Sequence, residues 1–176
     1  MMAKAKKVYW DTCAWLGLIN GEAEKKRSLG IIYGGAERGH YEIWTCATAI
    51  VEANRLKTEK QDSKPLTAEN LKVLDDLFLQ PFVKVMPNDI EVARMARKLF
   101  RETVGLGKKW DAVHLASAMR SNIEVFHTYD RDDLLHLNGS LICRNGNPLT
   151  ICYPDETTDG RLFAEASRKA GAGTAN

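Results

Sequence analysis

Short apolar runs alternate along the chain with longer segments in which apolar residues recur at helical spacing. Runs rich in valine, isoleucine and aromatic residues predict strands, which we place at Lys7–Trp10, Tyr41–Thr45, Phe82–Met86, Glu124–Thr128 and, more weakly, Thr150–Tyr153. The helical spacing predicts helices over residues 88–104 and 110–122, and a third from about residue 67 to 78. Strands that alternate with helices indicate an α/β fold in which helices cover both faces of a mostly parallel sheet.

Local signals mark some of the boundaries. Asn88, with Glu91 three residues later, resembles a capping box and predicts a helix that begins at Asn88. Asn145-Gly146 is typical of a hairpin turn and lies just before the last predicted strand.

Composition and length limit the class of protein. A chain of 176 residues is expected to form one domain, which we place at residues 1–155, followed by a C-terminal helix and disordered tail at 156–176. The net charge of +2 argues against a polycation and against an acidic tail. Because Asp11 interrupts the apolar stretch after the N-terminal lysines, we expect no signal peptide, no membrane association and a cytoplasmic location.

Acidic residues follow the predicted strands. Asp11 comes after the first strand, Glu52 lies on a helix after the second, Asp111 opens a helix, and Asp130 follows the fourth strand. Taken singly, each aspartate fits a helix N-cap and Glu52 fits a solvated helix position. Parallel sheets, however, place their sites at the carboxyl ends of the strands, so these acids are expected to gather at one edge.

A cluster of carboxylates is costly unless a cation offsets the repulsion. Mg²⁺ prefers oxygen ligands and is often held by a few carboxylates together with substrate phosphate. Such a site favours metal-assisted hydrolysis of a phosphodiester. The four histidines have no zinc-ligand spacing, and the four scattered cysteines contain no C-x-x-C pair.

Four elements in order resemble the PIN domain (PilT N-terminus), and most of all the VapC-like ribonuclease toxins of toxin–antitoxin pairs. They are Asp-Thr after the first strand, a glutamate on the next helix, Asp-Ala-Val-His-Leu-Ala, and Thr-Tyr-Asp after the fourth strand. The resemblance covers Lys7 to about Asp133, and more loosely extends to Tyr153. It implies a PIN-like α/β/α sandwich with a central sheet of about five strands and a Mg²⁺- or Mn²⁺-dependent endoribonuclease. It also implies a cognate antitoxin protein and a homodimer.

The resemblance also implies roles for individual residues. The acidic residues carried over by position form the metal and catalytic site: Asp11, Glu52, Asp111 and Asp130. The neighbouring polar residues would support these acids or serve as a reserve ligand: Thr12, Thr128 and Asp133.

Other residues near the acids have a structural and a functional interpretation. Basic residues that flank the acids could contact RNA phosphates or lie on a solvated face: Lys108, Lys109 and Arg131. Trp110 and Tyr129 could stack on a base or pack against protein. We interpret His114 as a helix-packing or hydrogen-bonding residue rather than a chemical one.

Three alternatives complete the sequence analysis. A PIN-type fold could bind RNA or act as a scaffold without turnover, and a PIN nuclease could process RNA in a housekeeping role instead of acting as a toxin. A phosphatase of the haloacid dehalogenase type also begins with an aspartate after its first strand. That family requires Asp-x-Asp, and Cys13 stands where the second acid would be.

Overall fold

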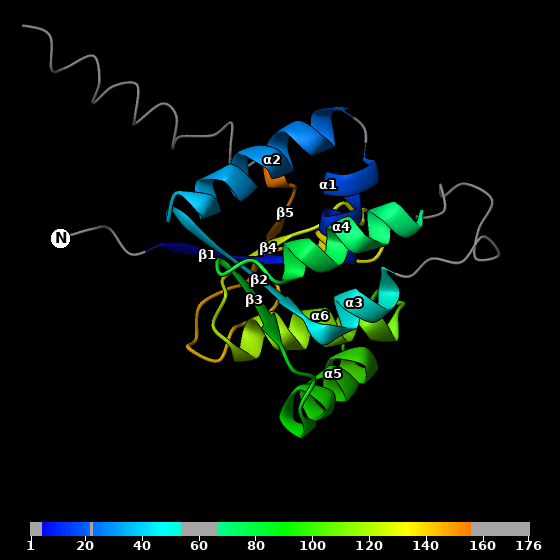
Figure 1. Ribbon diagram of the computed structural model, residues 1–176. Helices are drawn as coiled ribbons and strands as arrows, with labels where there is room; N and C mark the ends of the chain where they lie inside the picture. The colour runs from blue at the N-terminus through cyan, green and yellow to red at the C-terminus, as the bar shows by residue number, and fades with distance from the viewer. Residues whose placement is uncertain (1–4, 22, 54–66, 156–176) are drawn as a thin grey trace, which may run out of the picture.

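The computed structural model describes residues 5–21, 23–53 and 67–155 (Figure 1). The C-terminal helix and tail that we predict at 156–176 lie outside the described residues, so the division of the chain at residue 155 stays a prediction. Within the described ranges, no helix has both the length and the apolar character needed to cross a bilayer.

A five-stranded sheet forms the centre of the molecule, with strand order β3-β2-β1-β4-β5. All four pairs of neighbouring strands run parallel. The strands are β1 (Lys6–Trp10), β2 (Tyr41–Cys46), β3 (Val83–Met86), β4 (Val125–His127) and β5 (Thr150–Cys152). Each begins and ends within two residues of its predicted bounds, and the α/β/α fold predicted from the sequence is confirmed.

Helices cover both faces of this sheet. Helices α1, α2 and α4 lie on one face, and α5 and α6 lie on the other (Figure 1). The helices are α1 (Thr12–Asn20), α2 (Ala23–Glu37), α3 (Ala47–Glu52), α4 (Ala68–Phe78), α5 (Ile90–Glu102) and α6 (Lys109–Arg120). The three predicted helices correspond to α4, α5 and α6, whereas the sequence analysis did not predict α2.

The alternation of side chains along β1 builds two hydrophobic cores. Val8 and Trp10 pack on the face covered by α1, α2 and α4, whereas Tyr9 packs on the face covered by α5 and α6. All three side chains are fully buried. Burial on both faces explains why β1 is a continuous apolar run.

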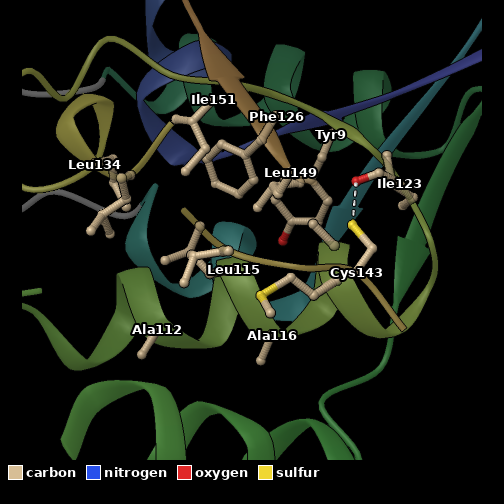
Figure 2. Close-up of a cluster of buried hydrophobic side chains, with 14 of the residues drawn as sticks. Tyr9, Ala112, Leu115, Ala116, Ile123, Phe126, Leu134, Cys143, Leu149 and Ile151 are labelled. Atoms are coloured by element: carbon tan, nitrogen blue, oxygen red, sulfur yellow. Dashed lines mark hydrogen bonds between the residues drawn. The ribbon is translucent and has the colours of Figure 1, made fainter. Parts of the chain in front are cut away.

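The core beneath α6 fixes the position of that helix against the sheet. The rings of Tyr9 and Phe126 are stacked with centroids 4.9 Å apart, and Leu115 of α6 lies against them (Figure 2). On the opposite side of α6, Ala112 and Ala116 point toward α5 (Figure 2). Their small side chains allow α5 and α6 to pack closely, so α6 is held between the sheet and α5.

The start of α5 differs from the prediction. Asp89, not Asn88, is the N-cap, and its Oδ1 accepts hydrogen bonds from the backbone N–H groups of Glu91 and Val92. The Asn88 side-chain amide instead donates to Thr48 Oγ1 at 2.8 Å. Both residues are good caps, and this tertiary hydrogen bond places Asn88 outside the helix.

The predicted turn at Asn145-Gly146 is confirmed. The Cys143 N–H donates to the Asn147 carbonyl oxygen at 2.8 Å, and an antiparallel bridge joins Ile142 to Pro148. Gly146 has a φ of 87°, a conformation that glycine adopts without a Cβ penalty. Beside this turn, Figure 2 shows the Cys143 thiol directed at the Ile123 carbonyl oxygen, 4.0 Å away.

Candidate functional site

The strand order reverses on either side of β1, which pairs with β2 along one edge and with β4 along the other. In open parallel sheets, such a reversal opens a crevice at the carboxyl ends of the strands. The register pairs Trp10 with His127, so the first residues beyond these strands, Asp11 and Thr128, are neighbours. A functional site is therefore expected between the carboxyl ends of β1 and β4.

Asp11 lies at the base of this crevice. It is the N-cap of α1, and its Oδ1 accepts a hydrogen bond from the Ala14 N–H at 2.9 Å. Thr128 Oγ1 donates to the other carboxylate oxygen at 2.5 Å. Burial raises the pKa of Asp11 to about 6, against the lowering effect of the Thr128 hydrogen bond and of His114. The N-cap predicted at Asp11 is thus confirmed, and the carboxylate is fixed through both oxygens.

Asp111 is the most poorly satisfied acid of the site. It lies in the first turn of α6 rather than at the cap, which is Lys108, so the cap interpretation is wrong for this residue. Its Oδ2 is buried and has no hydrogen-bond partner among the residues that the structure describes. Burial raises its pKa to about 7, assisted by the negative charges of Asp130 and Asp11 and opposed by Lys108. A buried carboxylate oxygen without a partner is costly, and a cation would remove that cost.

Asp130 and Asp133 lie on the turn that follows β4. Asp130 Oδ1 accepts hydrogen bonds from the backbone N–H groups of Asp132 and Asp133, so Asp130 caps this turn and not a helix. Lys108 Nζ lies 2.7 Å from Asp130 Oδ2 and 2.5 Å from Asp133 Oδ2. Burial alone would raise the pKa of Asp130, but the hydrogen bonds from Lys108 and from the backbone outweigh burial and lower it. The Asp130 carboxylate is therefore ionised at neutral pH, and Lys108 joins it to Asp133.

Asp111, Asp130 and Asp133 together form a group that fits a divalent cation. Each offers one carboxylate oxygen, and these oxygens lie within 4.8 Å of one another. An all-oxygen set suits Mg²⁺ or Mn²⁺. The unpartnered Asp111 Oδ2 is an independent sign that a positive ligand belongs here. Asp11 is not part of this group, although its charge is close enough to influence the pKa of Asp111.

Glu52 belongs to a second polar cluster at the same end of the sheet. It accepts hydrogen bonds from Thr12 Oγ1 at 2.5 Å and from His114 Nε2 at 2.8 Å. The buried His114 ring also contacts Tyr9 Oη at 2.8 Å and Cys46 Sγ at 3.6 Å through Nδ1. Burial would lower the pKa of His114, but its contacts with Cys46 and the Glu52 carboxylate outweigh burial and raise it. Thr12 follows Asp11 directly, so it connects this cluster to the base of the crevice.

The predicted acidic and threonine residues thus fall into two linked clusters. Glu52 and Thr12 lie together with His114. The other five lie at the carboxyl ends of β1 and β4 and the start of α6: Asp11, Asp111, Thr128, Asp130 and Asp133. The hydrogen-bonding interpretation of His114 is confirmed, but its pairing with Glu52 was not predicted. Its position three residues after Asp111 on the same helix was the available signal. Of the predicted RNA-contacting residues, Lys109 and Arg131 are exposed, whereas Lys108 is paired with two acids of the site.

Comparisons with known proteins concern the family and the fold of the chain. A family model described as the PIN domain matches residues 8–139. No curated protein matches the chain. One similar solved structure is that of Mycobacterium tuberculosis VapC20, described as a toxin that cleaves the sarcin-ricin loop. It is 15% identical, with a TM-score of 0.56, and the match covers 71% of this chain and 91% of the VapC20 chain.

Proposed function

Because the chain belongs to the PIN domain family, we propose that it is a divalent-metal-dependent endoribonuclease that hydrolyses RNA phosphodiester bonds, and that it is the toxin of a toxin–antitoxin pair. The observation that carries the nuclease proposal is the buried Asp111 Oδ2, which has no partner among the described residues, beside the carboxylates of Asp130 and Asp133. A purely structural cluster of acids would be expected to satisfy this oxygen internally.

In this proposal the carboxylates of Asp111, Asp130 and Asp133 hold Mg²⁺ or Mn²⁺, and Asp11 adds negative charge from the base of the crevice. When bound, the metal lowers the pKa of a water molecule and stabilises charge on the phosphate. Thr128 orients this arrangement, because it donates to Asp11 and accepts from the Asp130 N–H at 2.9 Å. Thr128 thereby fixes the position of Asp130 relative to Asp11.

Glu52 is proposed to orient the attacking water. It lies at the last residue of α3, and its side chain is 24% exposed. Its carboxylate lies at the same end of the sheet as the acids of the proposed metal group, and Thr12 and His114 donate hydrogen bonds to it. His114 and Thr12 hold it in one orientation.

Cleavage of a fluorescent single-stranded RNA by the purified chain tests the nuclease proposal. We expect cleavage in Mg²⁺ or Mn²⁺, none in chelator, and a loss of at least a hundredfold in Asp111→Asn. Asp132→Asn is the matched control, since it removes the same charge from an exposed residue of the same turn. No cleavage of several RNAs by the unmodified chain would refute the proposal and leave non-catalytic RNA binding.

The toxin role and its partners rest on the family and on the likeness to VapC20. Induced expression in bacteria should arrest growth, and Asp111→Asn should relieve the arrest. Normal growth with active enzyme would instead favour housekeeping RNA processing. We also propose a homodimer and a protein antitoxin as partners, for which light scattering of the purified chain and of the co-expressed pair is the direct measurement.

A further inference from the structure

An open cleft of about 220 Å³ lies at the end of the sheet that also carries the proposed metal site. Its lining residues are Glu24, Lys25, Ser28, Tyr129, Tyr153 and Asp155. They come from α2 and from the segments that directly follow β4 and β5. The cleft therefore lies at the same carboxyl edge of the sheet as the acids, but nothing in the proposed chemistry uses it.

Two tyrosine rings form one side of the cleft. The centroids of Tyr129 and Tyr153 are 5.9 Å apart, and the rings are inclined at 37°. Lys25 Nζ lies 5.3 Å from the centre of the Tyr129 ring. Gly17 of α1 leaves room for Tyr129, because a Cβ at that position would lie 3.3 Å from the ring. The Tyr129 ring thus packs against α1.

The size and chemistry of the cleft suit one planar heterocycle. Pockets for drug-sized ligands begin at about 300 Å³, so this cleft is suited to something smaller. Aromatic faces bind nucleobases by stacking, and a lysine next to an aromatic ring adds a cation–π component. A cleft of this kind is a stacking site for a single base.

The polar residues of the cleft indicate which bases it favours. Glu24 and Asp155 contribute carboxylates, which accept hydrogen bonds when ionised. A carboxylate accepts well from the exocyclic amine of cytosine, whereas uracil has no such amine. The same two negative charges repel phosphate, so they favour the base and not the backbone of a nucleotide.

The connection to the proposed active site is covalent and short. Tyr129 lies between Thr128, which hydrogen-bonds to Asp11, and Asp130 of the proposed metal group. One wall of the cleft therefore shares its backbone with the turn that carries the proposed metal group.

We propose that the cleft lined by Tyr129 and Tyr153 is a base-binding subsite, which takes an unstacked nucleotide next to the scissile phosphate and prefers a base with an exocyclic amine. The proposal rests on the ribonuclease function proposed above. It names the substrate class as RNA whose bases are accessible, in single strands or loops, since a paired base cannot enter the cleft.

Fluorescence anisotropy tests this subsite separately from catalysis. The full chain is titrated into fluorescein-labelled octamers of oligo(C) and oligo(U) in chelator, where the proposed cleavage cannot occur. We expect tighter binding of oligo(C), and a loss of at least about fivefold in Tyr129→Ala and Tyr153→Ala. Tyr129→Phe, which keeps the ring, should bind as the unmodified chain does. Removing both carboxylates, Glu24→Ala with Asp155→Ala, should abolish the preference for oligo(C).

Tyr33→Ala is the matched control, because this tyrosine packs edge to face with Phe82 in a different part of the protein. Thermal unfolding shows whether each variant folds. Ultraviolet cross-linking of oligo(C) to the unmodified chain, followed by mass spectrometry, requires no variant and should yield adducts on peptides containing Tyr129 or Tyr153.

The outcomes separate the two proposals. Adducts elsewhere, or unchanged binding in a folded Tyr129→Ala, would overturn the subsite even if the unmodified chain cleaves RNA in Mn²⁺. Adducts in the cleft and weakened binding in the alanine variants, without cleavage by the unmodified chain, would instead support base binding and refute the nuclease.

Discussion

Replacing Asp111 with asparagine should stabilise the metal-free protein at pH 8. The pKa of Asp111 is about 7 in the folded protein, against an ordinary value of 3.8. The folded state therefore binds this proton more tightly than the unfolded chain does, so stability falls as the pH rises from about 4 to about 7. Asparagine carries no charge and removes this pH-dependent penalty.

The size of the effect follows from the two pKa values. Without screening, the ionised carboxylate lowers the free energy of unfolding by about 4 kcal/mol at pH 8. Because Asp111 is 8% exposed and water screens part of its charge, we reduce this to about 2 kcal/mol. The same linkage predicts that the advantage of the variant falls to about a quarter at pH 4.5, where the folded protein is already protonated.

Urea unfolding of the unmodified chain, Asp111→Asn and the control Asp132→Asn provides the measurement. In chelator, only Asp111→Asn should gain stability between pH 4.5 and pH 8 relative to the unmodified chain. Mn²⁺ at about a hundred times its Kd should stabilise the unmodified chain by about 2.7 kcal/mol and Asp111→Asn by much less. A variant that is less stable than the unmodified chain at pH 8, or whose advantage is independent of pH, would refute the reasoning.

Other variants probe the groups around this acid. Lys108→Met should tighten Mn²⁺ binding at least threefold, as measured by calorimetry, because it removes the cation that contacts Asp130 and Asp133. The control is Lys109→Met, which removes an exposed lysine. An equally large effect in this control would argue against the explanation. Thr128→Val should lower the free energy of unfolding by about 1–3 kcal/mol in urea, since it removes a buried hydrogen bond to Asp11; unchanged stability would contradict it. Tyr9→Phe should cost about 1 kcal/mol in the same assay through the lost contact with His114, and no cost would show that this contact contributes nothing.

The strands were predictable because each is a short apolar run whose residues are buried by helices on both faces. The run that became β1 contains Val8, Tyr9 and Trp10, all fully buried. Strand ends could therefore be located in the sequence, and with them Asp11 and Asp130. The reversal of strand order beside β1 then brings these two residues to one crevice.

Other features depend on contacts between distant residues, which a single sequence does not display. Asn88 and Asp89 are equally good caps, and the choice between them is associated with a hydrogen bond from Asn88 to Thr48. Likewise, Lys108 has an ordinary loop position in the sequence, 22 residues from the Asp130 carboxylate that it contacts. Local propensity predicts elements, whereas these pairings require the whole fold.

The parallel pairing of β1 with β4 also has a consequence for the synthesis of the protein. Asp11 is held by Thr128, 117 positions further along the chain. At about 5–20 residues per second, the ribosome needs roughly 6–23 s to add the intervening residues. Until β4 has been made, β1 is paired with β2 alone, and Asp11 lacks both the strand on its other side and the hydrogen bond from Thr128. If the chain is the ribonuclease proposed above, a nascent chain without β4 would lack the completed site, and an interrupted synthesis would release an inactive fragment.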